Sequence, residues 1–347
     1  MQDQYARTYK IAPIYLASLA EAAAANGLDP GAFCAGLGFD IADLHTPGFT
    51  VTHQDACTAI RRALRVLPSP QLGFELGQRA NLAARGALAL GMLSSRTLKD
   101  AIMMMLRHPS SAGFLLDIDE QITRDQHVLT VTPMFGNGDL LPFLAEKTFA
   151  SLVRLWRAVM QTSSYTPLAV YFTHAASEKR IRAYEQFFGC PVYFGAAQCR
   201  LVSKASWLDF ELPFRSLVSY RLASDLLDRS FHPEGEATSI EIDVRAALKK
   251  VYRHRAPFAQ VAARLGLSER TLRRRLADDG LSFQTLLDEC RADYALALIG
   301  KTDIPLQELA EQTGFSSVSS LRRAFKRWTG RTLSEHNRST PSIDEET

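Results

Sequence analysis

The feature that most constrains the fold is an internal repeat in the C-terminal third of the chain. The segment PFAQVAARLGLSERTLRRRLADDG (257–280) recurs as PLQELAEQTGFSSVSSLRRAFKRWTG (305–330), at an offset of 48 to 50 residues. Each copy contains two helix-period runs separated by a glycine, which is Gly266 in the first copy and Gly314 in the second. A repeat of this length indicates two supersecondary units of one kind. We therefore predict two helix-turn-helix units.

The residue types inside each copy fit this geometry. Alanine in the middle of the first helix, Ala262 or Ala310, lets the second helix cross it closely. Glycine in the turn permits a left-handed backbone at which a Cβ atom would cost energy. The serine that follows, Ser268 or Ser316, is predicted to cap the second helix. The apolar pairs four residues apart, which are expected to face the core, are Leu272/Leu276 and Leu321/Phe325.

The positions between these apolar pairs are predicted to form the exposed face of each second helix. Arginine on such a face can donate two hydrogen bonds to guanine or neutralise a phosphate. The predicted DNA-binding residues are Arg270, Thr271, Arg273 and Arg274 in the first copy, and Ser317, Val318, Ser319, Ser320, Arg322, Arg323 and Lys326 in the second. The alternative is an ordinary helical domain whose surface arginines only increase solubility. The presence of two matching copies in a basic segment argues against it.

The charge is distributed unevenly between the two parts of the chain. Residues 245–338 contain 18 Lys and Arg against 10 Asp and Glu, whereas the remainder contains 22 against 27. A basic segment joined to an acidic body is typical of a phosphate-binding module attached to a different kind of domain.

The segment between the copies, SFQTLLDECRADYALALIGKTD (282–303), has apolar residues at helical spacing. A helix of about 15 residues is about 22 Å long. It could therefore be a rigid connection between two helices that read successive faces of the major groove, about 34 Å apart.

Residues 245–338 resemble the DNA-binding domain of the AraC/XylS family. The resemblance rests on the two helix-turn-helix units, the stretch from Arg291 to Ala295 in the connecting helix, and the G-F-S sequence of the second unit. It implies binding to double-stranded DNA and activation of transcription through contact with RNA polymerase. The segment 332–338 departs from the family's usual T-P-x-x-[YF]-R. The acidic pair Asp278 and Asp279 replaces residues that are usually basic, which predicts weaker phosphate contact there.

The first 229 residues are predicted to form an α+β domain. Polar and turn residues bound helix-period runs and β-branched runs in this region. The predicted helices are 12–27, 53–68, 95–108 (capped by Ser94 or Ser95), 146–161, 177–189 and 214–230. The predicted strands are 127–135 and 167–174, and a β-hairpin is predicted over 191–202.

Two segments of this region, 86–102 and 187–202, are similar to stretches in the effector domain of one AraC/XylS subgroup. That subgroup is arabinose-binding-like and includes ornithine-utilisation regulators, although the label does not imply arabinose. The predicted fold class is therefore an α+β N-terminal effector domain followed by an all-α domain with two helix-turn-helix units joined by a linker helix. The expected boundaries are 1–229 for the effector-binding and dimerisation domain, 230–243 for a linker, 244–338 for the DNA-binding domain and 339–347 for a disordered tail.

The remaining composition predicts a cytoplasmic protein without cofactor or metal. No apolar run reaches the roughly 18 residues of a membrane-spanning helix, and the N-terminus does not have the pattern of a signal peptide. The five cysteines are scattered without the spacing of a zinc or redox motif, so we expect most to be buried.

An enzyme is one alternative reading, and it has little support. The chain has no Gly-rich phosphate loop, no H-E-x-x-H and no G-x-S-x-G motif, so no catalytic residue is predicted. His174 follows a strand without an obvious Cys or Ser partner, which favours a structural histidine.

The working hypothesis is a homodimeric regulator whose N-terminal domain binds a small organic metabolite. Binding would change how the DNA-binding domains are presented to promoter half-sites. The alternative is an N-terminal domain that only dimerises or binds a protein partner. Effector-binding residues are not predictable, because the aromatic candidates fit a pocket and a core equally well. These are Phe114, Phe135, Phe143, Trp156, Tyr171 and Phe172.

Overall fold

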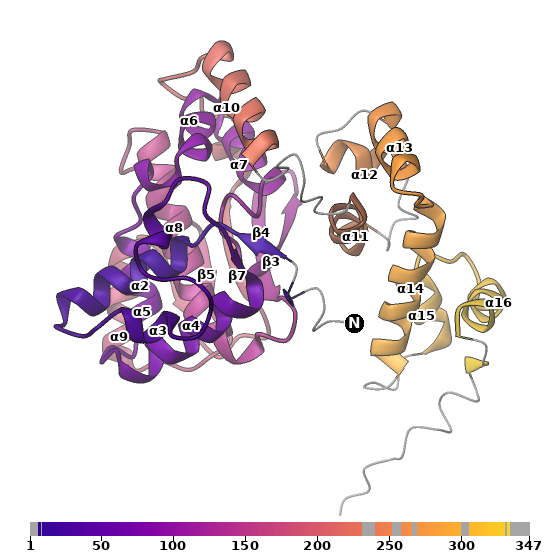
Figure 1. Ribbon diagram of the computed structural model, residues 1–347, viewed down its shortest axis with the longest axis horizontal. Helices are drawn as coiled ribbons and strands as arrows, with labels where there is room; N and C mark the ends of the chain where they lie inside the picture. Colours follow the sequence, from indigo (N-terminus) through magenta and orange to yellow (C-terminus); the bar gives the residue numbers. More distant parts are fainter. Residues whose placement is uncertain are drawn as a thin grey trace, which may run out of the picture. The chain divides into compact units, whose positions relative to one another are not determined.

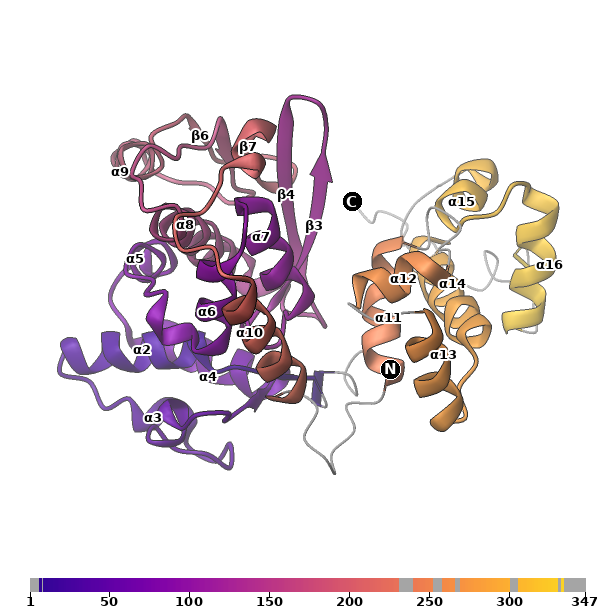
Figure 2. The same ribbon diagram turned by 90° about the horizontal axis from the view of Figure 1, so that it is seen from above.

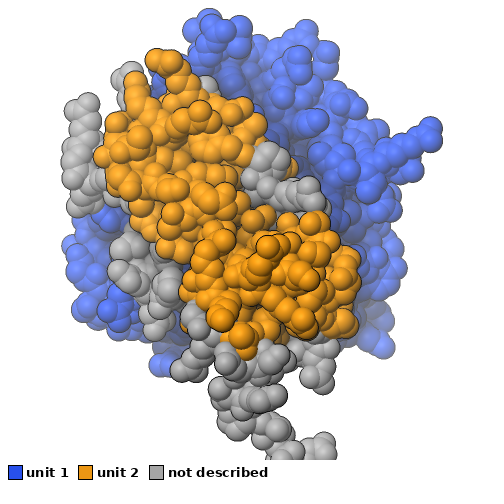
Figure 3. All heavy atoms as spheres, turned by 90° about the vertical axis from the view of Figure 1, so that its right-hand side faces the viewer, with its two compact units in different colours: residues 1–234 blue, residues 235–347 orange. Residues whose placement is uncertain are grey.

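The structure is a computed structural model that describes residues 6–7, 9–230, 240–251, 258–265, 269–299, 305–329 and 332–333. The chain forms two compact units, residues 1–234 (unit 1) and 235–347 (unit 2) (Figure 3). The predicted linker at 230–243 overlaps a helix at each end. One helix ends at Ser230. The next begins at Ile240, because Ile240 and Val244, which are four residues apart, are both buried in the core of unit 2. The predicted tail at 339–347 lies outside the described residues.

Unit 1 is built around a five-stranded sheet with the order β3-β4-β7-β5-β6. The strands are β3 (Leu116–Ile122), β4 (Gln126–Pro133), β7 (Cys199–Lys204), β5 (Ala169–Tyr171) and β6 (Val192–Tyr193). All neighbours are antiparallel except β5 and β6, which are parallel. A separate two-stranded pair joins β1 (Lys10–Ile11) to β2 (Val51–Thr52). The predicted strands 127–135 and 167–174 correspond to β4 and β5.

The predicted hairpin over 191–202 is wrong, because β5 lies between β6 and β7 in the sheet. The helix α9 (Glu178–Phe188) connects β5 to β6, and such a crossover allows the two strands to run parallel. The chain then passes through the turn at Gly195 and returns on the other side of β5. Strand β3 was not predicted, because polar residues at 119–121 interrupt its alternation.

The helices of unit 1 lie mainly on one side of this sheet (Figures 1 and 2). They are α2 (Ile14–Ala25), α3 (Gly31–Cys34), α4 (His53–Val66), α5 (Leu72–Gln78), α6 (Ala87–Ser94), α7 (Leu98–Arg107), α8 (Leu141–Val159), α9 and α10 (Leu217–Ser230). Four short 3₁₀ turns occur at Asp43–His45, Ala83–Arg85, Gly138–Leu140 and Ala205–Asp209. All six helices predicted in this region are present, which agrees with an α+β domain.

The N-cap of α7 differs from the prediction. Thr97 occupies the cap, and its Oγ1 accepts a hydrogen bond from the Asp100 backbone N–H at 3.2 Å. Ser94 and Ser95 instead donate to the carbonyls of Leu90 and Gly91 in the preceding helix. Ser94, Ser95 and Thr97 all have a hydroxyl that can cap a helix. The path of the chain before α7 places Thr97 at the capping position.

The long helix α8 forms the centre of unit 1. Its residues Phe149, Trp156 and Val159 are fully buried. The short helix α5 crosses α8 closely, since a Cβ atom on Gly77 would lie 2.5 Å from the Ala150 Cβ. Burial of α8 on both the helical side and the sheet side explains why its sequence is apolar on most faces.

Unit 2 is entirely helical in the residues that the structure describes. Its helices are α11 (Ile240–Val251), α12 (Phe258–Arg264), α13 (Glu269–Asp278), α14 (Phe283–Ile299), α15 (Leu306–Gln312) and α16 (Val318–Thr329). They enclose two apolar cores, one around Leu272 and Leu276 and one around Leu321 and Phe325. Helix α14 contributes Leu286, Leu287 and Cys290 to the first core and Ala295 to the second. The fold class predicted from the sequence is confirmed.

Candidate nucleic-acid interface

The first copy of the repeat folds into α12 and α13. Leu272 and Leu276 are buried, while Arg270, Arg273 and Arg274 are exposed, as their spacing predicts. These three arginines, which we call the first reading face, lie three and four residues apart on one side of α13. Thr271 is half-buried beside them. The predicted turn residues Gly266 and Ser268 lie outside the described residues.

Arg273 differs from the other arginines of the first reading face. Its guanidinium lies over the Phe258 ring, 5.2 Å from the ring centroid, and Phe258 packs edge-on against Phe283. Stacking on an aromatic ring holds the guanidinium plane while leaving its N–H groups available. Arg273 is therefore held in place before any ligand is bound.

The C-terminal end of α13 is acidic. Gly280 has a φ of +66°, and the Leu281 N–H donates to the Leu276 carbonyl at 2.7 Å, which closes the helix. Asp278 and Asp279 are exposed at this end. Negative side chains add to the negative end of the helix dipole there. This end of α13 is thus unsuited to contact with phosphate.

The second copy folds into α15 and α16. Gly314 has a φ of +79°, and the Phe315 N–H donates to the Ala310 carbonyl at 2.8 Å. The N-cap of α16 is Ser317, whose Oγ accepts from the Ser320 N–H at 3.2 Å, rather than the predicted Ser316. The two serine hydroxyls are also hydrogen-bonded to each other at 3.0 Å. Two of the predicted DNA-binding residues, Ser317 and Ser320, therefore also hold the start of α16.

The exposed side of α16 repeats the pattern of α13. Ser319, Arg322, Arg323 and Lys326 are exposed at helical spacing, and we call them the second reading face. Val318 is half-buried at its edge. Ser319, Arg322 and Arg323 match Arg270, Arg273 and Arg274 at an offset of 49. Within the described part of unit 2, no arginine of the two reading faces other than Arg273 has a side-chain partner.

Helix α14 connects the two copies through contacts that the sequence did not indicate. Arg327 of α16 pairs with Asp288 at 2.8 Å, and Tyr294 donates a hydrogen bond to Gln312 at 2.7 Å. Arg291 is buried with its guanidinium over Phe315, 5.1 Å from the ring centroid, and burial lowers its pKa. On the other side, Glu289 pairs with Arg245 of α11. These contacts hold α14 against α11 on one side and against α15 and α16 on the other.

Unit 1 has a hollow of about 280 Å³, the His53 hollow, between α4 and the loop 135–137. Its floor is formed by the buried side chains of His53, Cys57 and Asn137. Asn137 donates to the Leu115 carbonyl at 2.7 Å and accepts from the Met134 N–H at 2.9 Å. The walls and rim are formed by Ala6, Arg7, Gln54, Arg61, Phe135 and Gly136. Phe135 stands in a left-handed conformation (φ +43°) and is the one aromatic candidate that lines this hollow.

His53 and Cys57 do not form an activated nucleophile, although the Cys57 Sγ lies 3.7 Å from the His53 Nδ1. Burial lowers the pKa of His53 to about 4 and raises the pKa of the Cys57 thiol to about 11. At neutral pH the pair is thus a neutral imidazole beside a neutral thiol, and the reactive form of cysteine is the thiolate. This chemistry suits a polar floor for a small ligand, and it does not suit covalent catalysis.

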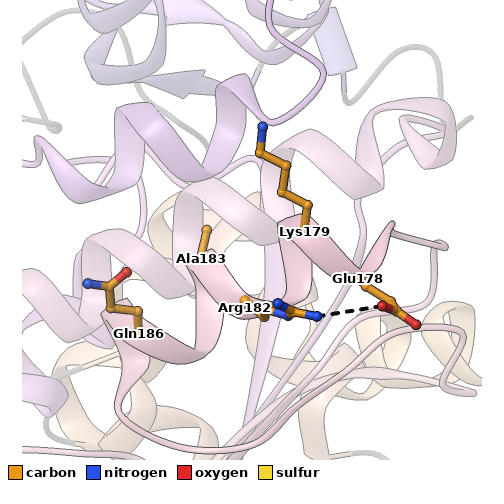
Figure 4. Close-up of a pocket in the computed structure, with 5 residues that line it drawn as sticks. All are labelled: Glu178, Lys179, Arg182, Ala183 and Gln186. Carbon is orange, nitrogen blue, oxygen red and sulfur yellow. Dashed lines mark ion pairs between the residues drawn. The ribbon is translucent and has the colours of Figure 1, made fainter.

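A second hollow, of about 430 Å³, follows the outer side of α9 (Figure 4). It is lined by Glu178, Lys179, Arg182, Ala183 and Gln186, and Arg182 pairs with Glu178 at 3.7 Å. All of its lining residues come from one helix, so it has no opposite wall to hold a ligand.

Most of the other candidates from the sequence lie in the interior of unit 1, whereas Tyr171 and His174 are half-buried. Phe114, Phe143, Trp156 and Phe172 are core residues, and Tyr171 stacks on Tyr193. His174 is paired through Nε2 with Glu146 at 2.7 Å, which agrees with a structural histidine. All five cysteines are buried, as expected, and none is in a disulfide. Among the described residues, no cluster suited to a metal ion is present, and no helix is long and apolar enough to cross a membrane.

Comparison with known proteins gives matches to both parts of the chain. Residues 27–212 match the family described as the arabinose-binding domain of AraC transcription regulator, N-term, and residues 261–339 match a helix-turn-helix domain family. An uncharacterised HTH-type transcriptional regulator of Mycobacterium tuberculosis is 28% identical over 335 residues, covering 94% of this chain and 96% of that protein. The ornithine utilization regulator of Pseudomonas aeruginosa is 26% identical over 275 residues, covering 77% of this chain and 78% of that protein.

Among solved structures, the transcriptional regulator CdpR from Pseudomonas aeruginosa has a TM-score of 0.49 and 20% sequence identity. It covers 94% of this chain, and 98% of the CdpR chain is matched. The names of both relatives describe them as regulators, and the name of the first describes an HTH-type transcriptional regulator.

Proposed function

Since the chain belongs to the AraC family of transcription regulators, we propose that it reads promoter DNA with α13 and α16, each placed in a major groove. The family and the arabinose-binding-like N-terminal domain predicted from the sequence are confirmed. The chain is a DNA-binding transcriptional regulator.

One observation carries this assignment. The same helical positions are exposed in both copies of the repeat, at an offset of 49 residues, while the apolar positions between them are buried. Basic side chains without a partner on such a face are suited to base edges and phosphates. The direct contacts are therefore assigned to Arg270, Arg273 and Arg274 of α13 and to Ser319, Arg322, Arg323 and Lys326 of α16.

The other predicted residues have supporting roles in this proposal. Ser317 and Ser320 hold the start of α16 through their hydrogen bonds to each other, and the backbone N–H groups of Val318 and Ser319 at this helix end are the ones proposed to face a phosphate. Thr271 and Val318 lie at the edges of the reading faces, where they can contact the DNA backbone or a thymine methyl group.

Arg322→Ala and Arg323→Ala are each expected to cost about 1–3 kcal/mol at the cognate site, a loss of about 5- to 150-fold in affinity, where the arginine reads a base. Where the arginine contacts a phosphate instead, its replacement by alanine lowers the affinity equally on all sequences and reduces the slope of log affinity against log salt by about 1. The measurement is fluorescence anisotropy at two salt concentrations. The labelled DNA carries the motif that is recovered by sequencing the genomic fragments retained by the full-length protein.

Arg327→Ala is the matched control, because Arg327 lies on the same helix but pairs with Asp288 instead of extending the second reading face. It is expected to change the affinity less than either reading-face variant. If Arg322→Ala and Arg323→Ala bind as tightly as the wild type on every sequence, α16 does not read DNA in this way.

Unit 1 is proposed to bind a small organic metabolite in the His53 hollow. The support is a neutral polar floor, an aromatic wall at Phe135 and arginines at the rim, which fits the pattern of a ligand site. A metabolite present at 100 times its dissociation constant stabilises the folded state by about 2.7 kcal/mol. A panel of amino acids, sugars and short organic acids should therefore contain a compound that raises the melting temperature. That shift should be smaller in Phe135→Ala.

The contrary result would favour the alternative function. If no compound raises the melting temperature while DNA binding is intact, unit 1 serves dimerisation or a protein partner alone. In either case we expect a cytoplasmic homodimer that activates transcription through RNA polymerase. A reporter assay with and without the chain tests the sign of regulation.

A further inference from the structure

Lys147 is a buried lysine in the middle of α8 that has no counter-charge. It is 3% exposed, and its ammonium group lies over the Tyr15 ring of α2, 4.2 Å from the ring centroid. Among the described residues it forms no hydrogen bond and no ion pair. A ring face attracts an ammonium group but does not neutralise its charge. Because buried charges in proteins are normally paired, Lys147 is without the partner that its burial requires.

A second cation, Arg85, acts on Lys147. Arg85 ends the short turn Ala83–Arg85, and its Nη1 donates a hydrogen bond to the Ala112 carbonyl at 3.1 Å. In the described part of the chain, no carboxylate pairs with it. Burial lowers the pKa of Arg85 to about 10. Burial and the positive charge of Arg85 together lower the pKa of Lys147 to about 7, against the opposing charge of the exposed Glu21. The two cations therefore destabilise each other as long as no anion lies between them.

The same side of α8 has a hydroxyl group that is also without a partner. Ser151 lies one helical turn after Lys147 and is 5% exposed, and its Oγ has no hydrogen bond with any described residue. The Tyr15 hydroxyl is hydrogen-bonded to the Thr148 Oγ1 at 2.7 Å, which holds the ring under the ammonium group. We call Tyr15, Arg85, Lys147 and Ser151 the Lys147 site. None of these side chains lines the His53 hollow.

We propose that the Lys147 site binds the carboxylate group of a small molecule. A carboxylate has one negative charge and two acceptor oxygens, which the Lys147 ammonium, the Arg85 guanidinium and the Ser151 hydroxyl can bind. Since Tyr15, Lys147 and Ser151 are almost fully buried, only the head group of the ligand enters the site. This site is additional to the metabolite site of the proposed function. The unpaired charge is a cost to the ligand-free chain, which the ligand removes when it binds.

The test uses acetate, the smallest probe with a methyl-bearing carboxylate, on the full chain at pH 6.5. At 100 mM, sodium acetate should raise the melting temperature by about 2 °C or more relative to 100 mM sodium chloride. Acetamide has almost the same shape without the charge and should give no such rise. Inorganic phosphate, tested at the same ionic strength, distinguishes a carboxylate site from a phosphate site.

Lys147→Met removes the charge and keeps a long apolar side chain. Its acetate-induced shift should disappear. In chloride it should melt at the temperature of the wild type or above it, because an apolar group replaces an unpaired buried charge. Lys99→Met, the same substitution at an exposed position of α7, is the control and should keep the full shift.

The pH dependence provides a second readout. In the ligand-free chain Lys147 loses its proton as the pH rises through about 7, whereas acetate stays ionised. Above that pH, acetate must therefore bind together with a proton. Its affinity should fall about 10-fold or more between pH 6.5 and pH 8.5, measured as the acetate-induced shift relative to chloride at each pH.

An acetate-induced shift that persists in Lys147→Met overturns the proposal, as does a folded Lys147→Met protein that melts below the wild type in chloride. A shift with phosphate but not with acetate overturns the assignment to a carboxylate. Should Lys147→Met not fold, Ser151→Ala replaces it in the test. That variant removes a single unpartnered hydroxyl, and an undiminished acetate-induced shift in it overturns the proposal.

Phe135→Ala distinguishes this site from the one in the proposed function. A shift that is lost in Phe135→Ala and kept in Lys147→Met would assign acetate to the His53 hollow and overturn the present proposal. The opposite pattern supports the Lys147 site and leaves the His53 hollow to be judged by its own ligand.

Discussion

Phe325→Ala is expected to lower the free energy of unfolding of unit 2 by about 3–5 kcal/mol, as removal of a fully buried aromatic ring does. The Phe325 side chain has no exposed surface and lies at the centre of the second core with Leu321 and Ala310. The cavity would loosen α16 against α15, and specific DNA binding should fall with the folded fraction. Urea denaturation followed by circular dichroism measures the loss.

Lys326→Ala is the matched control for this prediction, because it changes the next residue of the same helix, which is exposed. It should change the stability by no more than about 0.5 kcal/mol while still weakening DNA binding. A stability loss below about 1 kcal/mol in Phe325→Ala would mean that the second core is not packed around this ring.

Glu146→Gln is expected to destabilise unit 1 by about 3 kcal/mol, because it breaks a buried ion pair from one side. Glu146 is 3% exposed, and its Oε1 accepts from Arg180 at 2.9 Å and lies 2.7 Å from the His174 Nε2. Without the carboxylate charge, the Arg180 guanidinium remains largely buried opposite a neutral amide. The reverse outcome, an unchanged melting temperature, would show that solvent reaches this pair in the native state.

Glu178→Gln provides the comparison on a neighbouring element. Glu178 begins α9 and pairs with Arg182 at 3.7 Å, with both side chains almost fully exposed. Exposed pairs of this kind contribute little to stability. The melting temperature of Glu178→Gln should therefore match that of the wild type, and the difference between the two variants isolates the effect of burial.

The sequence predicted unit 2 well because the evidence there is local and is repeated. The spacing of Leu272 from Leu276 and of Leu321 from Phe325 determines which face of each helix is buried. The exposed positions follow from the same period. The contacts made by α14 were not predictable in this way. Asp288 and Arg327 are 39 residues apart, and their pairing depends on how α16 crosses α14.

In unit 1 the type of element was predictable, but the pairing of elements was not. The run 191–202 has the residue types of two strands, yet β6 pairs with β5 because α9 crosses over between them. The identity of the N-cap residue was also not predictable, although it depends on only a few neighbouring residues. Thr97 and Ser317 were each preceded by other hydroxyl residues of equal capping ability, and only the path of the preceding turn decides among them.

The His53 hollow had no signal in the sequence. His53 and Asn137 are 84 residues apart, and neither belongs to a recognised motif. Their approach results from the packing of α4 against the loop that follows β4. Side chains that line a hollow only because distant elements pack together are not marked by the residues beside them in the sequence. Only the folded structure therefore identifies them.

The division of α14 between the two cores of unit 2 has a geometric consequence for the DNA that the regulator can use. An α-helix turns by about 100° and advances by 1.5 Å for each residue. Adding one residue to the middle of α14 would therefore rotate the α15–α16 half around the helix axis by more than a quarter turn relative to the first half. In the proposed binding mode, the number of residues in α14 therefore sets the rotational phase between the two base-pair segments of an operator. Operators for this protein should tolerate changes of sequence at single positions more readily than insertion of a base pair between the two segments.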